Sequence, residues 1–337
     1  KYKKQYFSGL CFDSSKCKKD NIFFAIKGTK TDGNKFINHA IKKGAKIIIS
    51  KQKFEGLKNN ILFIKSSNVR KCLSEIAYAI YKDKPRNITA VTGTNGKSSV
   101  ADFYFQILQL NKKKVASIGT LGIKTQNYIK KISNTTIDSI TLSICLNKLK
   151  QEKINNVILE ASSHGLKQNR LDGLRFKTGI FTNLSHDHLD YHKTFDDYLK
   201  SKLYLFENLL EKNANIITDI EIPQHIKIRD IALKKKCNIE TISNNNSNLE
   251  IISHKYQDGK QLVKIRYNKK IYEFQTRLIG KVQIKNILMA MIAATKSSLS
   301  FKKIVSTINN IKPVSGRLEQ IGIIKNNSKV ILDYAHT

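Results

Sequence analysis

The sequence predicts an α/β protein with a small amino-terminal α/β domain, a central domain built on a mainly parallel sheet with a β-rich patch, and the start of a third α/β domain. Short apolar runs alternate with helix-length stretches, and a glycine-rich turn links one apolar run to an amphipathic helix. Alternation of this kind implies parallel strands joined by helical crossovers. Lys84-Pro85-Arg86 interrupts the pattern. We therefore expect domains at residues 1–84, 85–314 and 315–337, the last one incomplete.

The first domain contains three short apolar runs separated by longer amphipathic stretches. The expected strands are Ile22–Ile26, Lys46–Ser50 and Ile61–Ile64. The stretches Phe36–Lys43 and Asn68–Lys82 have helical periodicity. Strands and helices thus alternate from the beginning of the chain.

The central domain repeats this alternation from Asn87 onward. Its expected strands are Ile88–Thr92, Val115–Ile118, Val157–Ala161 and Gly179–Thr182, and its expected helices are Lys97–Leu110, Ile140–Lys150 and Phe195–Leu209. The β-rich patch comprises Leu249–Ile252, Gln261–Arg266 and Ile271–Phe274, followed by helices at Ile284–Thr295 and Phe301–Asn309. Strands at Glu319–Ile324 and Lys329–Asp333 would open the third domain. Ligands of such sheets bind at the carboxyl ends of the strands.

The composition is strongly basic, which raises the question of a nucleic-acid partner. The 337 residues include 60 Lys and Arg against 26 Asp and Glu, a formal net charge of +34. Only 8 of the basic residues are Arg, and the lysines are spread along the chain without forming one basic block. A compositional drift with lysines on solvated faces explains this pattern. We therefore expect no nucleic-acid partner.

The apolar pattern and the cysteines indicate the compartment. No apolar run approaches the roughly 18 residues that span a bilayer, and Lys1–Cys11 lacks the apolar stretch of a signal peptide. The five cysteines are scattered without a CxxC pair, as is typical of free thiols in a reducing compartment. We expect a cytoplasmic monomer without membrane insertion. Lys at position 1 and the strand near the end suggest that both ends are fragment boundaries.

A phosphate-binding loop is the strongest local signal. The run AVTGTNGKSS at 90–99 leads from an apolar strand through a tight glycine turn into a helix. Gly93 and Gly96 let backbone amides face one point, and the helix start adds partial positive charge. Lys97 can reach the outer phosphates of ATP, and the Ser98 hydroxyl can bind Mg²⁺. Val91 replaces the first glycine of the usual spacing, so a plain glycine turn is the alternative.

The same loop carries a resemblance to a known family. GTNGKS at 93–98 after a strand resembles the nucleotide loop of the Mur ligases and their folylpolyglutamate synthase relatives. Further motifs in the family's order narrow the resemblance to the MurE type. They are NTT at 134–136, EASSHGL at 160–166, QNR at 168–170, FTNLSHDHLDYH at 181–192, GRLE at 316–319 and DYAHT at 333–337. Each motif alone is weak, but the ordered set covers nearly the entire chain.

The resemblance implies a reaction in peptidoglycan synthesis. ATP phosphorylates the terminal carboxylate of UDP-N-acetylmuramoyl-L-alanyl-D-glutamate, and the amine of a diamino acid attacks the acyl phosphate. Bringing two anions together requires cations and fixed geometry. The family implies that meso-2,6-diaminopimelate is added, with L-lysine as the alternative, and that the selecting motif lies beyond residue 337. A chain cut there is expected to bind nucleotide yet ligate poorly.

The resemblance also assigns metal and catalytic residues. Ser98, Glu160 and His188 would form a Mg²⁺ site, although His is a less usual Mg²⁺ ligand. Lys202, fourteen residues after His188, matches the lysine that reacts with CO₂ to form a metal-binding carbamate. The alternatives are a strand-end surface carboxylate, a loop histidine bonded to Asp187 or Asp190, and a solvated helix lysine. Lys200 is the rival position for the carbamate.

The remaining site residues follow from the same motifs. The expected ATP contacts are Gly93, Thr94, Asn95, Gly96, Lys97, Ser98, Ser99, Asn286, Arg317 and Asp333. The expected contacts with the UDP-linked precursor are Phe12, Ser14, Thr29, Lys30, Thr31, Asn134, Thr135, Thr136, Ser162, Gln168 and Arg170. Ordinary capping and loop hydrogen bonds are the alternative for these polar residues. The sequence departs from the family at Ser15, Ile137, Gln283 and Ser315, which weakens the uridine and adenine assignments most.

Two other functions compete with this interpretation. A folylpolyglutamate synthase would share the nucleotide loop, but the leading domain and the Ser162-Ser163-His164 stretch argue against it. A basic nucleic-acid-binding protein with a phosphate loop would need clustered Arg or exposed aromatic residues beside basic ones, and the sequence offers neither.

Overall fold

The computed structural model describes residues 6–28, 31–325 and 328–334. The chain forms two compact units. The amino-terminal unit comprises residues 1–82 together with 138–145 and 168–174, and the central unit comprises residues 83–137, 146–167 and 175–337. The domain boundaries expected after residues 84 and 314 stay predictions.

The amino-terminal unit is a five-stranded sheet with helices on both faces. Its strand order is β1 (Gly9–Cys11), β2 (Asn21–Phe24), β3 (Ile47–Ser50), β5 (Ile61–Lys65) and β4 (Gly56–Lys58), and only β4 runs antiparallel to its neighbour. Alternate residues of a strand face opposite sides of a sheet. Phe23 and Ile48 accordingly pack with α1 (Ile37–Lys42) on one face, while Phe24 packs with α2 (Val69–Ile80) on the other.

Small differences from the expected elements have local causes. The strand expected at Ile22–Ile26 ends at Phe24, because the Ile26 amide turns back to donate to the Phe24 carbonyl at 2.9 Å. A 3₁₀ turn at Gly33–Phe36 precedes α1, capped by the Asp32 carboxylate. The side chain of Asn68 caps α2 by accepting from the Lys71 amide.

The central unit is built on one eleven-stranded sheet. Its order is β16 (Lys270–Thr276), β15 (Lys260–Tyr267), β14 (Leu249–Gln257), β13 (Asn238–Ser243), β12 (Leu210–Asp219), β11 (Phe176–Phe181), β6 (Asn87–Thr92), β10 (Asn156–Glu160), β7 (Val115–Gly119), β8 (Gly122–Lys124) and β9 (Ile129–Lys130). The strands from β14 to β7 pair in parallel, and antiparallel hairpins extend both ends. The expected α/β class, with a mainly parallel sheet and a β-rich patch, is confirmed.

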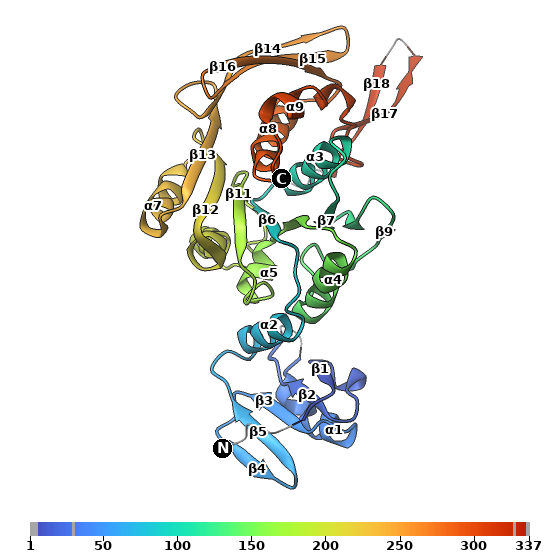
Figure 1. Cartoon of the computed structure of the whole chain (residues 1–337). Helices are drawn as coiled ribbons and strands as arrows, with labels where there is room; N and C mark the ends of the chain where they lie inside the picture. The colour runs from blue at the N-terminus through green and yellow to red at the C-terminus, as the bar shows by residue number, and fades with distance from the viewer. Residues whose placement is uncertain (1–5, 29–30, 326–327, 335–337) are drawn as a thin grey trace. The chain divides into compact units, whose positions relative to one another are not determined.

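One large core fills the space between this sheet and three helices. These are α3 (Lys97–Leu110), α8 (Lys281–Thr295) and α9 (Phe301–Val305), and α3 packs directly against α8 (Figure 1). Fully buried side chains such as Phe103 and Met291 meet strand residues such as Ile158 there. The remaining helices are α4 (Ser139–Gln151), α5 (Ser163–Lys167), α6 (Phe195–Tyr204) and α7 (His225–Lys235).

The carboxyl-terminal half departs most from the sequence prediction. The strands β12 and β13 and the helix α7 between them were not expected, because lysines, asparagines and acids obscure their apolar periodicity. The helix expected at Phe195–Leu209 is an α-helix only to Tyr204 and continues as a π-helical turn. The helix expected at Phe301–Asn309 ends at Val305. The strands β17 (Glu319–Ile324) and β18 (Ser328–Leu332) form a separate two-stranded sheet.

Within the described part of the chain, no helix combines the length and the apolar character needed to cross a membrane.

The packing of the central core gives a stability prediction. Ile158 in β10 is completely buried, whereas Ile226 in α7 is 62% exposed. Ile158→Ala should lower the free energy of unfolding by about 2–5 kcal/mol, because it removes buried methyl groups and leaves a cavity. Ile226→Ala is the matched control and should change it by less than about 0.5 kcal/mol. Urea titrations of both variants measure the difference, and equal losses would contradict this account of the core.

Candidate nucleotide and metal site

The candidate site lies where the direction of strand addition reverses. The sheet places β6 between β10 and β11, so the chain builds one half of the sheet before β11 starts the other. Ligands of parallel sheets bind outside the carboxyl ends of strands at such a reversal. Because β6 and β10 are parallel, Thr92 and Glu160 at their ends meet at the same edge.

The loop after β6 requires both of its glycines. Gly93 has φ 141° and Gly96 has φ 85°, values that side-chain-bearing residues rarely adopt. A Cβ on Gly93 would lie 2.0 Å from the Thr182 hydroxyl oxygen, and one on Gly96 would lie 2.5 Å from the amide oxygen of Asn286. The turn is therefore possible only with glycine at these two positions.

Asn183, which follows β11, holds the first half of the loop. The Thr94 amide donates to the Asn183 carbonyl at 2.9 Å, and the Asn95 amide donates to the Asn183 side-chain oxygen at 2.9 Å. The first turn of α3 leaves its N–H groups without intrahelical acceptors, and the helix dipole adds positive potential there. The amides from Lys97 to Ser99 are therefore the part of the loop suited to phosphate oxygens.

Two lysines converge on one backbone oxygen. Lys97 donates to the carbonyls of Gly93 at 2.9 Å and Thr94 at 2.7 Å, and Lys202 from α6 donates to the same Gly93 carbonyl at 2.7 Å. Burial lowers the pKa of Lys202 well below its ordinary value, and the charge of Lys97 lowers it further. Burial also lowers the pKa of Lys97, although the Glu160 carboxylate opposes this effect. The two amines therefore lie next to each other beside the loop.

Burial separates Lys202 from its rival Lys200. The Lys202 side chain is 1% exposed, and its amine lies 4.3 Å from the centroid of the Tyr198 ring. Lys200 is exposed and forms an ion pair with Asp196, one turn earlier on α6, at 2.7 Å. Of the two lysines, only Lys202 faces the loop.

Glu160 is a buried carboxylate held by neutral donors. It accepts from the Thr120 amide at 2.8 Å, the Thr120 hydroxyl at 3.3 Å and the Ser98 hydroxyl at 3.0 Å. Burial raises the pKa of the carboxyl group, while the charge of Lys97 lowers it. A Cβ at Gly119 would lie 2.1 Å from a Glu160 carboxylate oxygen, so glycine is needed at the end of β7 as well.

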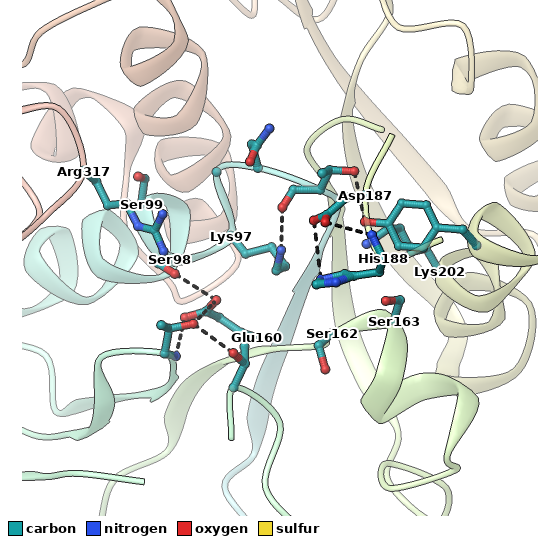
Figure 2. A pocket seen from close by; sticks show the side chains of 16 residues that line it. Lys97, Ser98, Ser99, Glu160, Ser162, Ser163, Asp187, His188, Lys202 and Arg317 are labelled. Atoms are coloured by element: carbon teal, nitrogen blue, oxygen red, sulfur yellow. Dashed lines mark hydrogen bonds and ion pairs between the residues drawn. The ribbon is translucent and has the colours of Figure 1, made fainter. Parts of the chain in front are cut away.

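These groups line one cavity of about 260 Å³ in the central unit (Figure 2). The predicted residues in its wall are Thr94, Asn95, Gly96, Lys97, Ser98, Ser99, Thr135, Glu160, Ser162, His188, Lys202 and Arg317. The wall also contains Thr120, Ser163, Asp187 and Tyr198, which the sequence analysis did not assign to the site. Two signals could have found some of them. Thr120 directly follows a predicted strand, and Tyr198 lies four residues before Lys202 on one helix face.

His188 lines the cavity but contacts a carboxylate. It has φ 53°, and its Nε2 lies 3.4 Å from a carboxylate oxygen of Asp187. The His164 ring packs edge-on against it at 4.9 Å between centroids. The contact with Asp187 fits the alternative of a loop histidine, while the position in the cavity wall fits a ligand role.

The side-chain oxygen atoms near the loop are of the kind that Mg²⁺ prefers as ligands. A carboxylate and a hydroxyl, from Glu160 and Ser98, lie 3.0 Å apart, and Mg²⁺ prefers oxygen ligands. Across the described residues, no three His, Cys, Asp or Glu side chains gather as a ready-made metal cluster. A cation here would therefore also need ligands such as hydroxyls, phosphate oxygens or a modified lysine.

His192 is a buried histidine that the sequence analysis left without a role. Its ring is completely buried, with Nδ1 3.3 Å from the Ser201 hydroxyl and 3.6 Å from an Asp197 carboxylate oxygen. It packs against the rings of Tyr191 and Tyr198. Burial lowers the pKa of His192 to about 4, and the charge of Lys167 acts in the same direction.

The residues expected to hold the muramoyl peptide divide between the two units. In the central unit, the Thr136 hydroxyl donates to the Glu160 carbonyl at 2.7 Å and accepts from the Ser162 amide at 2.9 Å. Thr135 lies 3.1 Å from the Thr120 hydroxyl, and Asn134 is exposed. The segment 134–136 is thus fixed beside the end of β10.

Gln168 and Arg170 belong to the amino-terminal unit. The Gln168 side-chain oxygen accepts from the Arg170 guanidinium at 2.8 Å and from the Arg70 guanidinium at 3.5 Å. Arg70, which the sequence analysis did not predict, also lines a small cleft with Lys27 and Asn34. Two guanidinium groups on one amide oxygen form a local positive patch.

The expected uridine residues are only partly assembled. The buried Ser14 hydroxyl lies 2.9 Å from Nδ1 of His39, whereas Phe12 is 41% exposed. The Thr31 carbonyl accepts from the Gly28 amide at 2.8 Å. Thr29 and Lys30 lie outside the described residues.

The three remaining residues that were predicted to contact ATP lie in different environments. Asn286 is buried under Gly96 and bonds to Gln283. Arg317 lines the cavity. The Asp333 carboxylate is exposed and accepts from the Leu318 amide at 3.3 Å, and it is absent from the cavity wall.

Comparison with known proteins gives consistent similarities. The profile of the Mur ligase family catalytic domain matches residues 6–87, and that of the Mur ligase middle domain matches residues 91–294. The UDP-N-acetylmuramoyl-L-alanyl-D-glutamate–2,6-diaminopimelate ligase of Rickettsia montanensis is 35% identical over 98% of this chain and 68% of its own length. The ligase of the same name from Agrobacterium fabrum is 33% identical over 97% of this chain and 66% of its own.

Solved structures show the same fold. A UDP-N-acetylmuramoyl-L-alanyl-D-glutamate–2,6-diaminopimelate ligase superposes with a TM-score of 0.85 and 26% identity, covering 100% of this chain and 69% of that one. The Thermotoga maritima MurF ligase in complex with ADP gives 0.65 and 15% identity, with coverage of 93% and 68%. An FPGS–AMPPCP complex gives 0.64 and 13%, with coverage of 80% and 73%.

The burial of His192 predicts a pH dependence of stability. Its pKa is about 4 in the folded protein and about 6.5 when unfolded, so the unfolded chain binds the extra proton first as the pH falls. Stability should therefore be lost between about pH 6.5 and about pH 4. In His192→Phe this loss should be smaller by about 1–3 kcal/mol. Urea titrations across this range measure it.

His186→Phe, at an exposed histidine of the same loop, is the matched control. If the free energy of unfolding of His192→Phe falls with pH as steeply as that of the unaltered chain, another group causes the loss of stability in acid.

Proposed function

The chain belongs to the Mur ligase family as a MurE-type, ATP-dependent ligase, and on that premise we propose that it adds a diamino acid to UDP-N-acetylmuramoyl-L-alanyl-D-glutamate. Meso-2,6-diaminopimelate is the proposed amino acid, because the ligases from Rickettsia and Agrobacterium carry it in their names. L-Lysine is the alternative. The family profiles of the two matched domains cover both units of the chain.

One observation carries the proposal. A phosphate loop, a buried carboxylate and a buried lysine from three separate segments line the same cavity, represented by Lys97, Glu160 and Lys202. Each of these groups is costly to bury unless a ligand compensates it. A site of this kind suits the transfer of a phosphoryl group between two anions.

The proposed reaction has two steps. A carboxylate oxygen of the precursor attacks the γ-phosphorus of ATP, which forms an acyl phosphate and releases ADP. The amine of the diamino acid then attacks the acyl carbon, which forms the amide and releases phosphate and a proton. Lys97 would exchange its two carbonyl acceptors for phosphate oxygens, and the amides at the start of α3 would bind the same phosphates. Arg317, which lies shortly before β17 and lines the same cavity, would also contact the phosphates.

Mg²⁺ would be held by Ser98 and Glu160, with His188 and the modified Lys202 as further groups. A bound Mg²⁺ ion would neutralise part of the negative charge on the phosphate oxygens. Glu160 suits this role because its carboxylate is buried beside the loop and its hydrogen-bond donors are the neutral groups of Thr120 and Ser98.

Lys202 is proposed to carry a carbamate. The neutral amine nitrogen forms a bond with the carbon of CO₂ and loses one proton, which turns a buried neutral amine into an anion. Only a neutral amine reacts in this way, and the lowered pKa of Lys202 favours that form. Lys200 is exposed and paired with Asp196, so it lacks this environment.

The proposed precursor contacts are the residues that the sequence analysis assigned to it. Thr135, Thr136 and Ser162 offer hydroxyls beside the cavity, and Gln168 and Arg170 offer an amide and a guanidinium suited to a diphosphate. Phe12, Ser14 and the loop ending at Thr31 are the proposed uridine contacts.

Release of ADP provides the test of the reaction. The chain is incubated with Mg²⁺, ATP and UDP-N-acetylmuramoyl-L-alanyl-D-glutamate, with meso-2,6-diaminopimelate, L-lysine or no amino acid. Amide product that requires diaminopimelate, even when it forms slowly, supports the proposal, and product with L-lysine alone would shift it to the alternative. Thermal stabilisation by a folate but not by the UDP-linked precursor would instead favour a folylpolyglutamate synthase.

The carbamate has its own direct prediction. With ¹³C-bicarbonate, the protein should show a carbamate carbon signal in NMR spectra, and Lys202→Arg should abolish it because a guanidinium does not form the adduct. Lys200→Arg on the same helix is the matched control and should keep the signal. A signal that survives Lys202→Arg would refute the assignment.

A further inference from the structure

The segment 312–317 links the central unit's last helical turn, Ile308–Asn310, to the sheet of β17 and β18. The segment ends at Arg317, which lines the cavity. Its residues belong neither to a helix nor to a strand of the large sheet. Something must therefore fix the path of this segment if Arg317 is to stay in the cavity wall.

Gln106 on α3 fixes the beginning of the segment. Its side-chain nitrogen donates to the Lys312 carbonyl at 3.1 Å, and its side-chain oxygen accepts from the Lys312 amide at 2.9 Å. The side-chain amide thus pairs with both polar groups of one backbone residue, as a neighbouring strand would do. This contact specifies one register of the segment relative to α3.

Gln106 is itself held in place by a buried carboxylate. Its nitrogen also donates to Asp102 at 2.7 Å, and Asp102 forms an ion pair with Lys124 at 2.5 Å. Asp102 is 4% exposed and lies one helical turn after Ser98 on α3. The orientation of Gln106 is therefore tied to the same helix whose first turn forms the phosphate loop.

A second glutamine holds the other end of the segment. Gln283 on α8 is buried and donates to the Arg317 carbonyl at 3.1 Å. Between the two glutamines the chain turns at Gly316, with φ 66°, and the Arg317 amide donates to the Val314 carbonyl at 3.0 Å. The backbone path from Lys312 to Arg317 is thus defined by contacts at both ends and one internal bond.

We propose that Gln106 is a positioning residue for ATP binding, which holds the segment 312–317 in the register that places Arg317 in the cavity. This inference rests on the proposed function, since it assumes that Arg317 contacts the ATP phosphates. Gln106 itself is absent from the cavity wall, so its effect on ATP must pass through Arg317.

A thermodynamic cycle on four proteins tests this route. Gln106→Met keeps the length and helical preference of the side chain but removes both contacts with Lys312. The proteins are the unaltered chain, Gln106→Met, Arg317→Ala and the double variant. Titration calorimetry measures the Kd of Mg²⁺–AMPPCP for each, and thermal melting without nucleotide checks their folding.

Both single variants should bind the analogue about tenfold more weakly, on the scale of one or two lost hydrogen bonds. The double variant should bind as weakly as Arg317→Ala alone, because Gln106 acts only through that arginine. Gln109→Met, at an exposed glutamine of the same helix, is the matched control and should leave Kd unchanged.

Two results would overturn the inference. One is an unchanged Kd for Gln106→Met, and the other is a full additional loss in the double variant, which would mean that Gln106 acts independently of Arg317. If the unaltered chain does not bind Mg²⁺–AMPPCP, the proposed function fails, and that failure is distinct from an unaffected Gln106 variant.

Discussion

Gly93 carries the constraint on which the rest of the central unit depends. The chain leaves β6 there with a positive φ, and the space where a Cβ would stand already holds the Thr182 hydroxyl. This close approach brings the loop against the segment after β11, so that Asn183 can hold the amides of Thr94 and Asn95. The Gly93 carbonyl then accepts hydrogen bonds from the amines of both Lys97 and Lys202. A larger residue at position 93 would separate the phosphate loop from its supports.

The burial of ionisable groups makes this site costly for the stability of the fold. Lys202 and Glu160 are both almost completely buried, and their pKa values move toward the neutral form of each group. Neither shift would help a purely structural residue, because a buried neutral amine or acid contributes less to an ion pair. Shifts of this kind are typical of functional sites, where a ligand supplies the missing charge.

The sequence predicted the parts of the site that depend on local rules. The glycine loop and the helix Lys97–Leu110 followed from turn chemistry and periodicity, and both occur as expected. The family resemblance assigned Glu160 to the site, and the parallel pairing of β6 and β10 explains why it lies near the loop. What the sequence could not predict are pairings across long separations. The contact of Gln106 with Lys312 joins residues 206 positions apart, and no local pattern marks either partner. The strand β12 was missed for a related reason, because its burial depends on neighbouring strands more than on its own mixed composition.

The side chains that hold the site in place are largely uncharged amides and hydroxyls, and this has a physical consequence. Asn183 supports the loop, the hydroxyl and amide of Thr120 hold Glu160, and two glutamines hold the segment that carries Arg317. If ion pairs held these groups instead, the lysines and arginines would already be paired with carboxylates. A paired lysine or arginine attracts the phosphate groups of a ligand less strongly. Neutral supports leave the charges available and keep their geometry fixed. The +34 net charge of the chain is therefore a poor guide to its chemistry, because a few buried charges on neutral supports define the site.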